Sequence, residues 1–552
     1  MNFILYSAID EKSINTNLGL PEYSYYFLVK AFRRVLATLG SVTVVQHPET
    51  EVDPIFEACR QRGESCVFLS FSPPNKTLIN LQCPTVSAFA CEFGHVPIAQ
   101  WNDDVRNDWR VVFAKHGRAI TLSNYAARAV RQTMGDTFPV FAIRAPLWDT
   151  FATTRAELGS AQAKVAARLR IRGLIIDSHT VGLSADHRIQ HLWWPGKAVQ
   201  EPEVVVVETP VMSELLEALT IGQIVDGIAM EQAAPIVLPP KTLRFRLAAT
   251  KRHLLAWYRE VVRDALPLWL AKALAWIARK SYVLLRRILR LDSRSRALPA
   301  AEVEAPEVTV EAEVAPAAAE TPFETPVEIL LPEEVLALDG IVYTSVFAPY
   351  DARKNWVDMV TAFVWTFRDT RDATLVLKTA HPDLSHYREA LLELLAELSP
   401  FQCRVVVLHA HLDDAAYGAL IGASTYYVNS SVSEGACLPI QEFMSCGKPV
   451  IAPAHTAMED YIDDTVAFVV KASVEPMPWP NDPHGLFRTL RYRINWDSLC
   501  DAYRESYRVA TVAPGCYAQM SDSARAKMNA YCSDAVVTEQ LRTFFDLSQA
   551  AA

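Results

Sequence analysis

Two glutamates, Glu434 and Glu442, lie eight positions apart where the sequence predicts a strand, a polar loop, a helix and a second strand. Glu434 falls in the loop from Ser430 to Cys437, and Glu442 falls in the helix from about Leu438 to Cys446. Open α/β sheets bind ligands where a loop at the carboxyl end of a parallel strand meets a helix N-terminus. The pattern therefore predicts a ligand site that contains these two carboxylates.

The elements on either side must hold this loop in place. Tyr426–Asn429 predicts the strand before the loop, and Pro449–Ile451 opens a buried parallel strand after the helix. Gly447 stands just past the helix, where a residue with left-handed backbone commonly ends a helix. We expect both carboxylates to be positioned by buried secondary structure.

More strand–helix alternation surrounds this segment. Gly340–Phe347 predicts a strand, the next loop contains Arg353 and Lys354, and an apolar helix follows from Trp356 to about Phe367. Further strands are predicted at Thr374–Lys378, Arg404–Leu408 and Thr425–Val428, with helices at His386–Leu398 and Asp414–Gly422. Such alternation indicates a doubly wound parallel sheet. After it, Asp522–Phe545 predicts a charged amphipathic helix that packs across the domain junction.

The first part of the chain predicts a second sheet of the same kind. Strands are expected at Phe3–Ser7, Val42–Val45, Cys66–Ser70 and Val140–Ile143, and helices at Glu22–Leu39 and, capped by Ser123, at Asn124–Met134. From residue 150 to about 240 the pattern weakens. Leu169–Asp177 and Val204–Glu208 are expected strands there, and it stays open whether they complete the first domain or are inserted into it.

Three residues of the first part are candidates to contact a second ligand. Gly19 lies in a loop between strand and helix, where a glycine lets backbone approach a ligand closely. Glu92 and His95 follow the apolar run Val86–Ala90, which places them at the carboxyl end of a predicted strand. The alternatives are a purely structural turn at Gly19, and a surface carboxylate with a structural histidine at the other two positions.

Residues 241–296 carry fifteen lysines and arginines against three acidic residues, interleaved with leucines and aromatic residues. Apolar and basic residues at helical spacing favour a helix that lies in a membrane interface. Attraction to anionic headgroups contributes about 1 kcal/mol per basic residue near the surface. The alternative is a helix packed on the protein with a solvated basic face.

The next segment, from residue 298 to about 336, is rich in Ala, Pro, Glu and Val, and it has no basic residue from position 302 to 334. It cannot bury enough apolar area to offset its ordering entropy, so it predicts an extended, disordered linker. We therefore expect domains at 1–240 and 337–517, a basic helical segment at 241–297, the linker at 298–336 and a C-terminal helix within 518–552.

The overall composition excludes several classes of protein. A chain of 552 residues with 51% hydrophobic residues is long enough for two globular domains. Its net charge of −10 disfavours a general nucleic-acid binder. Ten scattered cysteines show no zinc-ligand or disulfide spacing, which favours a reducing, cytoplasmic setting. No apolar run predicts a spanning helix, and the first residues lack the pattern of a signal peptide.

With these residues in view, the second domain resembles the retaining glycosyltransferases of the GT-B fold, family 4 in particular. Glu434 and Glu442 match the E-x7-E motif of that family, and Met444–Ile451 matches the helix and strand that follow it. Arg353-Lys354-Asn355, with the apolar helix after it, matches the donor-phosphate loop. The motifs lie in order over Gly340–Asp464 and are strongly specific, whereas the resemblance of residues 1–150 to the acceptor half is weaker and rests on element order, the Gly19 loop and the Glu92 segment.

The resemblance implies a role for each residue. Glu434 would lie against the donor sugar, Glu442 would bind the ribose hydroxyls, and Arg353 with Lys354 would face the leaving diphosphate. The donor would also meet the loop at Ser433, Gly435, Ala436, Cys437 and Leu438, while Gly19, Glu92 and His95 would lie on the acceptor side. No metal or other cofactor is implied, because the family usually works without a divalent ion, and the diphosphate itself takes the acceptor proton on the same face.

One position departs from the family pattern. The family commonly has an arginine five positions before the lysine, and here that position is Pro349. Arg353 may stand in for the missing arginine, or the loop may align differently, and the sequence leaves both open.

The sequence thus predicts an α/β protein with two Rossmann-like domains facing across a cleft. The expected activity is retaining transfer of a sugar from a nucleotide-sugar donor to a surface polysaccharide or lipid-linked glycan, at the inner face of the cell membrane. The alternatives are another GT-B enzyme, such as a nucleotide-sugar epimerase or an inverting transferase, and a non-catalytic membrane-tethered scaffold that binds glycans.

Overall fold

The computed structural model describes residues 1–11, 13, 22–100, 104–159, 162–183, 333–379, 381, 384–479 and 488–547. All of them belong to one compact unit, which comprises residues 1–199 and 326–552. The predictions for Gly19, for Val204–Glu208, for the basic segment 241–296 and for the linker as far as residue 332 lie outside the described residues.

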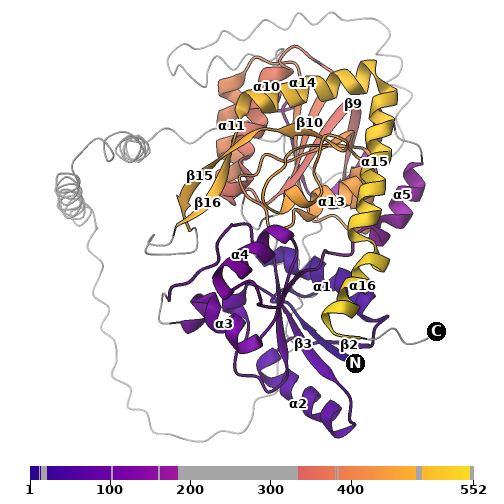
Figure 1. Cartoon of the computed structure of the whole chain (residues 1–552). Coiled ribbons are helices and arrows are strands. Elements are labelled where there is room, and N and C mark those ends of the chain that lie inside the picture. The colour runs from indigo at the N-terminus through magenta and orange to yellow at the C-terminus, as the bar shows by residue number, and fades with distance from the viewer. Residues whose placement is uncertain are drawn as a thin grey trace, which may run out of the picture. The chain divides into compact units, whose positions relative to one another are not determined.

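The first sheet is entirely parallel, with the order β2-β1-β3-β4-β5-β6 (Figure 1). Its strands are β1 Asn2–Tyr6, β2 Ser41–Val44, β3 Cys66–Phe71, β4 Thr85–Phe89, β5 Ala119–Thr121 and β6 Val140–Ala142. In β3 and β4 every residue is buried, because helices cover both faces of the sheet. The predicted first doubly wound sheet is confirmed.

The helices of this half follow their apolar spacing. They are α1 Tyr23–Leu36, α2 Pro48–Gln61, α3 Trp109–His116, α4 Asn124–Met134 and α5 Ala152–Leu158, with short 3-10 turns η1 Pro74–Lys76, η2 Val105–Asn107 and η3 Asp149–Phe151. The predicted cap of α4 is confirmed, since Ser123 Oγ accepts a hydrogen bond from the Ala126 N–H at 3.2 Å.

The second sheet has eight strands, six of which pair in parallel in the order β14-β13-β12-β9-β10-β11. These are β9 Glu333–Phe347, β10 Ala373–Thr379, β11 Arg404–His409, β12 Tyr426–Val428, β13 Val450–Pro453 and β14 Ala467–Val470. The strand order reverses between β9 and β12, because β10 and β11 lie on one side of β9 and β12 to β14 on the other. The loops that follow β9 and β12 therefore meet at a topological switch point, where open sheets bind ligands.

The remaining two strands correct the predicted domain boundary. β7 Val165–Arg172 pairs antiparallel with the first half of β9, and β8 Leu174–Asp177 pairs antiparallel with β11, so residues 165–177 belong to the second sheet and not to the first domain. Arg404 holds this edge, since its Nη2 lies 2.6 Å from an oxygen of Asp177. β9 begins at Glu333, so the last residues of the predicted linker are strand.

The helices of the second half surround this sheet, and a two-stranded hairpin stands beside it. The helices are α10 Trp356–Thr366, α11 Ser385–Leu398, α12 Asp414–Gly422, α13 Leu438–Ser445 and α14 Trp496–Val512, with 3-10 turns η5 Ala352–Lys354 and η6 Thr456–Asp460. The hairpin consists of β15 Ala472–Pro478 and β16 Arg488–Ile494. Gly447 has φ +81°, which confirms the predicted left-handed position after α13.

The chain ends in two helices where the sequence predicted one. α15 Pro514–Cys532 packs against α13, and α16 Asp534–Phe544 packs against α1 of the first half (Figure 1). Ser533 separates them with extended backbone. The Phe3 and Phe545 rings lie 5.3 Å apart, so this end of the chain joins the cores of the two sheets.

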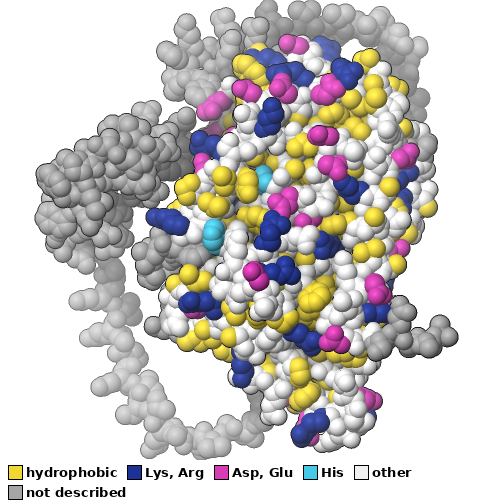
Figure 2. All heavy atoms as spheres, in the orientation of Figure 1, with side chains coloured by type: hydrophobic (Ala, Val, Ile, Leu, Met, Phe, Trp, Pro, Cys, Tyr) yellow, Lys and Arg dark blue, Asp and Glu magenta, His cyan; other side chains and the backbone are white. Residues whose placement is uncertain are grey.

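Both halves therefore form one α/β body, and the predicted fold class of two Rossmann-like domains facing across a cleft is confirmed. On the face shown in Figure 2, basic and acidic side chains are intermixed over the described surface. Among the helices that the structure describes, none combines the length and the apolar character needed to cross a membrane.

Candidate functional site

A cavity of about 1680 Å³ lies between the carboxyl ends of the two sheets. Residues of both halves line it, from α1 and the loop after β4 on one side to the loops after β9 and β12 on the other. Small-molecule sites in proteins are commonly about 300–1,000 Å³. The cavity is therefore large enough to hold two substrates together.

The loops after β9 and β12 are joined by one backbone hydrogen bond and by side-chain hydrogen bonds to backbone carbonyls. The Val432 N–H donates to the Arg353 carbonyl at 2.8 Å, and Ser430 Oγ donates to the carbonyls of Lys354 and Asn355 at 3.2 and 3.0 Å. Asn355 has a left-handed backbone, with φ +49°, and its amide donates to the Ser430 carbonyl at 3.3 Å. The two predicted motifs are thus fixed against each other at the switch point.

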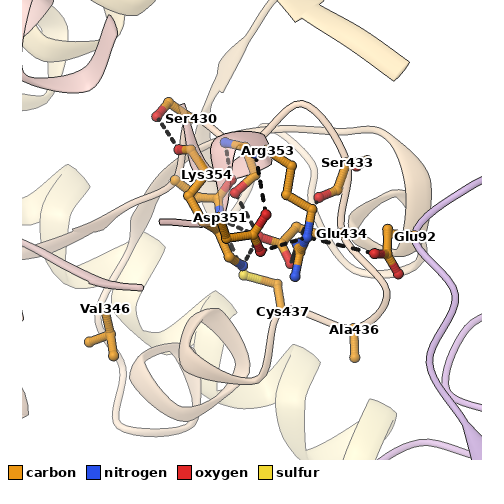
Figure 3. Close-up of polar contacts among 12 residues, drawn as sticks. Glu92, Val346, Asp351, Arg353, Lys354, Ser430, Ser433, Glu434, Ala436 and Cys437 are labelled. Atoms are coloured by element: carbon orange, nitrogen blue, oxygen red, sulfur yellow. Dashed lines mark hydrogen bonds and ion pairs between the residues drawn. The ribbon is translucent and has the colours of Figure 1, made fainter. Parts of the chain in front are cut away.

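Glu434 lies at the centre of this junction and is only 2% exposed (Figure 3). Lys354 Nζ donates to one carboxylate oxygen at 2.6 Å, and Arg353 Nη1 donates to the other at 2.9 Å. Ser431 Oγ adds a third hydrogen bond at 2.6 Å. Every group around the carboxylate is a donor, so the site is built for a charged glutamate.

The electrostatics agree with this geometry. Burial alone would raise the pKa of Glu434, but the charges of Lys354 and Arg353 outweigh burial and hold the pKa well below its ordinary value. For Arg353, burial alone would lower the pKa. The negative charges of Glu434, Glu92 and Asp351 outweigh burial, so the pKa of Arg353 is raised above its ordinary value. Glu434 and Arg353 are therefore both charged at neutral pH.

Arg353 connects the second sheet to the first. Its Nε lies 2.9 Å from an Asp351 oxygen and 3.7 Å from an oxygen of Glu92, which follows β4 in the first sheet. Figure 3 shows Glu92 approaching Arg353 from the opposite side to Lys354. Arg353 and Lys354 both contact Glu434 and line the cavity.

The loop between Glu434 and α13 places backbone N–H groups beside these charges. The N–H groups of Gly435, Ala436 and Cys437 donate to no other described residue, and all three residues line the cavity. A Cβ on Gly435 would lie 2.9 Å from the Ala90 Cβ, so only glycine permits this approach of the loop to the first sheet. Leu438, which begins α13, also lines the cavity, whereas Ser433 is fully buried and offers its carbonyl to Arg353 at 3.0 Å.

Glu442 faces the cavity from α13 and has different partners from Glu434. The Tyr417 hydroxyl of α12 donates to its Oε2 at 2.5 Å. Burial raises the pKa of Glu442 to about 7. The hydrogen bond from Tyr417 and the charge of Lys378 act in the opposite direction but do not cancel the effect of burial. The two glutamates of the motif therefore differ in charge state, with Glu434 fully ionised and Glu442 near its midpoint at neutral pH.

The candidate residues from the first half differ in whether they line the cavity. Glu92 lines the cavity and reaches the charged cluster, whereas His95 is exposed and does not line the cavity. Gly19 lies outside the described residues. The prediction that His95 belongs to the site is therefore not supported, although its neighbours Phe93 and Pro97 line the cavity.

Sequence reasoning missed several groups that complete the site. Asp351 and Ser431 hold Arg353 and Glu434, the Glu434 N–H donates to Thr456 Oγ1 at 3.0 Å, and Lys378 lines the cavity at the end of β10. Each stands within a few residues of the carboxyl end of a parallel strand. That position is the signal that could have identified them.

We compared the chain with known proteins and structures. No protein-family profile and no curated protein matches it. Among solved structures, Anabaena HepE in complex with UDP and glucose has a TM-score of 0.43 and 10% identity, covering 99% of each chain. A glycosyltransferase from Rickettsia africae has a TM-score of 0.45 and 8% identity, covering 100% of this chain and 99% of the other. Sucrose-phosphate synthase from Thermosynechococcus elongatus has a TM-score of 0.44 and 11% identity, covering 100% of both. The function is therefore argued from the site itself.

Proposed function

We propose that this chain is a GT-B glycosyltransferase of the family 4 type, which moves a sugar from a nucleotide-sugar donor to a glycan acceptor with retention of the anomeric configuration. The observation that carries the proposal is the junction of Arg353, Lys354 and Glu434 at the switch point of the second sheet. It brings two cations and three backbone N–H groups to one wall of a cavity that holds two substrates.

This arrangement suits the departure of a diphosphate. When the bond between the anomeric carbon and the diphosphate oxygen breaks, negative charge grows on that oxygen, and fixed cations and N–H dipoles lower the barrier. Arg353 and Lys354 supply the cations in this proposal, so no divalent metal is required. Glu434 lies against the donor sugar, Glu442 binds the ribose hydroxyls, and the diphosphate oxygen accepts the proton of the attacking hydroxyl.

The other substrate enters from the first sheet. Glu92 is the polar group that this half brings closest to the donor cluster, with its carboxylate 3.7 Å from Arg353. We assign it to the acceptor side, where it can accept a hydrogen bond from a sugar hydroxyl. The acceptor class is a surface polysaccharide or a lipid-linked glycan.

A thermal-shift screen tests this function most directly. UDP, GDP, ADP and the corresponding nucleotide sugars are added to the full chain, and we expect at least one set to raise the melting temperature. Binding at 100 times Kd stabilises a protein by about 2.7 kcal/mol, which such a screen detects. No shift with any of them would contradict the proposal, and the anomer of the product then separates a retaining transferase from an inverting one or an epimerase.

We further propose that residues 241–296 bind the inner face of the cell membrane and hold the enzyme near its acceptor. The support is the sequence of this segment, in which basic residues alternate with leucines and aromatic residues. β8 ends at Asp177 and β9 begins at Glu333, so residues 241–296 contribute no strand to either described sheet. The segment can therefore be removed without cutting either sheet.

We predict that deletion of residues 241–296 releases the protein from anionic liposomes. The full chain should sediment with vesicles that contain phosphatidylserine and remain in solution with neutral vesicles, and the shortened chain should remain in solution with both. Deletion of the acidic residues 302–330 is the matched control and should leave sedimentation unchanged. Equal sedimentation of the two deletion variants would refute the membrane role, and nucleotide binding checks that the core stays folded.

A further inference from the structure

Lys378 is a buried lysine whose ammonium group lacks a partner in the described structure. It lies near the end of β10, lines the cavity and is 7% exposed. No described residue accepts a hydrogen bond from its Nζ, and no described carboxylate lies within 4.0 Å of it. Lys378 Nζ is not among the fully buried unpaired atoms of the described residues, so the ammonium opens on the cavity, where a ligand can supply its acceptor.

Glu442 faces the same part of the cavity with one oxygen free. Tyr417 occupies Oε2, while Oε1 accepts from no described residue. The charges of Lys378 and Glu442 act on each other, since each moves the pKa of the other toward its charged form. Both groups line the cavity and no described hydrogen bond or ion pair joins them, so a ligand group can lie in the gap between them.

The neighbours of this pair do not fill the gap. His409 Nε2 lies 2.7 Å from the His381 carbonyl, and His411 Nδ1 lies 3.3 Å from the Tyr23 hydroxyl. Burial first, and then the charge of Lys378, lower the pKa of both imidazoles, so both are neutral at neutral pH. Lys378 therefore provides the local positive charge, and Glu442 provides the acceptor.

The chemistry of the gap selects one kind of group. A phosphate would suit Lys378 but would repel Glu442 in its ionised form, and an amine would suit Glu442 but would meet the positive charge of Lys378. A hydroxyl accepts from the ammonium and donates to the carboxylate at the same time. With about 2.8 Å to each partner, one hydroxyl oxygen bridges up to about 5.6 Å.

We propose that Lys378 is a specificity-determining residue that, together with Glu442, holds one hydroxyl of the ribose of the donor nucleoside. The inference rests on the proposed function, which places the ribose at Glu442 and the diphosphate at Arg353 and Lys354. Lys378 makes this part of the site depend on a ribose hydroxyl and reject a deoxyribose, because without that hydroxyl both buried groups stay unpaired.

The test compares ribose and deoxyribose nucleotides on the wild-type chain and on Lys378→Met. UDP, GDP and ADP, with their 2′-deoxy and 3′-deoxy forms, are titrated by calorimetry; they carry no donor sugar, so a hydroxyl effect reports the ribose. We expect wild type to bind one deoxy form at least about tenfold more weakly than the ribose form. Lys378→Met should bind the ribose form about 10- to 100-fold more weakly than wild type does. Its affinities for the ribose and deoxyribose forms should differ by less than about threefold.

Lys448→Met is the matched control. Lys448 is also 7% exposed and burial also lowers its pKa to about 8, but it donates to the Gly422 carbonyl and does not line the cavity. This variant should keep the wild-type ratio, and melting temperatures verify the folding of all three proteins. Equal binding of ribose and deoxyribose forms by wild type, or an unchanged ratio in Lys378→Met, would overturn the inference. Failure of wild type to bind any of these nucleotides would instead remove the proposed function.

Discussion

Glu434→Gln should lower sugar transfer by about 10²–10³-fold or more and, at the same time, tighten the binding of the nucleoside diphosphate by about tenfold. In the described structure the carboxylate occupies Arg353 and Lys354, the same cations that the diphosphate needs. The glutamine removes this competing charge, so the diphosphate gains affinity. It also removes the charge that faces the reacting sugar, so the reaction loses rate.

The measurement combines single-turnover transfer with calorimetry of the nucleoside diphosphate identified by the screen. Donors surround the carboxylate, so the NH2 group of the glutamine faces another donor, Arg353 or Lys354. Without ligand, the free energy of unfolding of the variant should therefore be about 1–3 kcal/mol lower than that of wild type. The diphosphate should restore this stability. Full transfer activity would exclude Glu434 from the chemistry, and weaker diphosphate binding would show that it supports the ligand and does not compete with it.

Lys354→Met is expected to lower transfer by a similar factor of about 10²–10³, but with the opposite effect on binding. The nucleoside diphosphate should bind about 10- to 100-fold more weakly, because a fixed cation at the cavity wall is lost. Glu434 keeps Arg353 at 2.9 Å and Ser431 at 2.6 Å, so the fold should survive. Methionine preserves the length and apolar stem of the side chain.

The same calorimetry measures this variant, and Lys448→Met again serves as the control for removing a buried lysine outside the cavity. The double variant Glu434→Gln with Lys354→Met adds a sharper criterion. If the two side chains act as one unit, its loss of transfer should be far smaller than the product of the two single losses. Wild-type affinity for the diphosphate in Lys354→Met would rule out Lys354 as a phosphate ligand.

Local patterns were sufficient to predict the part of the site that the second sheet supplies. The strand before Ser430, the helix from Leu438 and the left-handed Gly447 each depend on residues close in sequence, and the structure has all three. The contact between Arg353 and Glu434 is a long-range one, 81 positions apart, yet both follow carboxyl ends of strands that become neighbours. The rule for open sheets was enough to bring them together.

Other features depend on partners that a local pattern does not contain. β7 resembles a strand of the first domain in sequence order, but its partner is the first half of β9, more than 150 positions later. His95 is exposed while its neighbours Phe93 and Pro97 line the cavity, and Lys378 lies on the side of β10 that faces the cavity. One-residue changes in strand register reverse such placements, so sequence alone does not determine them.

The pairing of β7 with β9 also affects how the amino-acid sequence can change during evolution. Eight residue pairs, from Val165 with Gly340 to Arg172 with Glu333, close by strand pairing a loop of chain that contains the whole stretch between residues 183 and 333. The entropy cost of closing a loop rises only by about 0.6 kcal/mol for each doubling of its length. Insertions, deletions or exchanged sequences within that loop therefore cost the core little stability. The sequence between residues 183 and 333 can diverge quickly while Arg353, Lys354 and Glu434 stay in register.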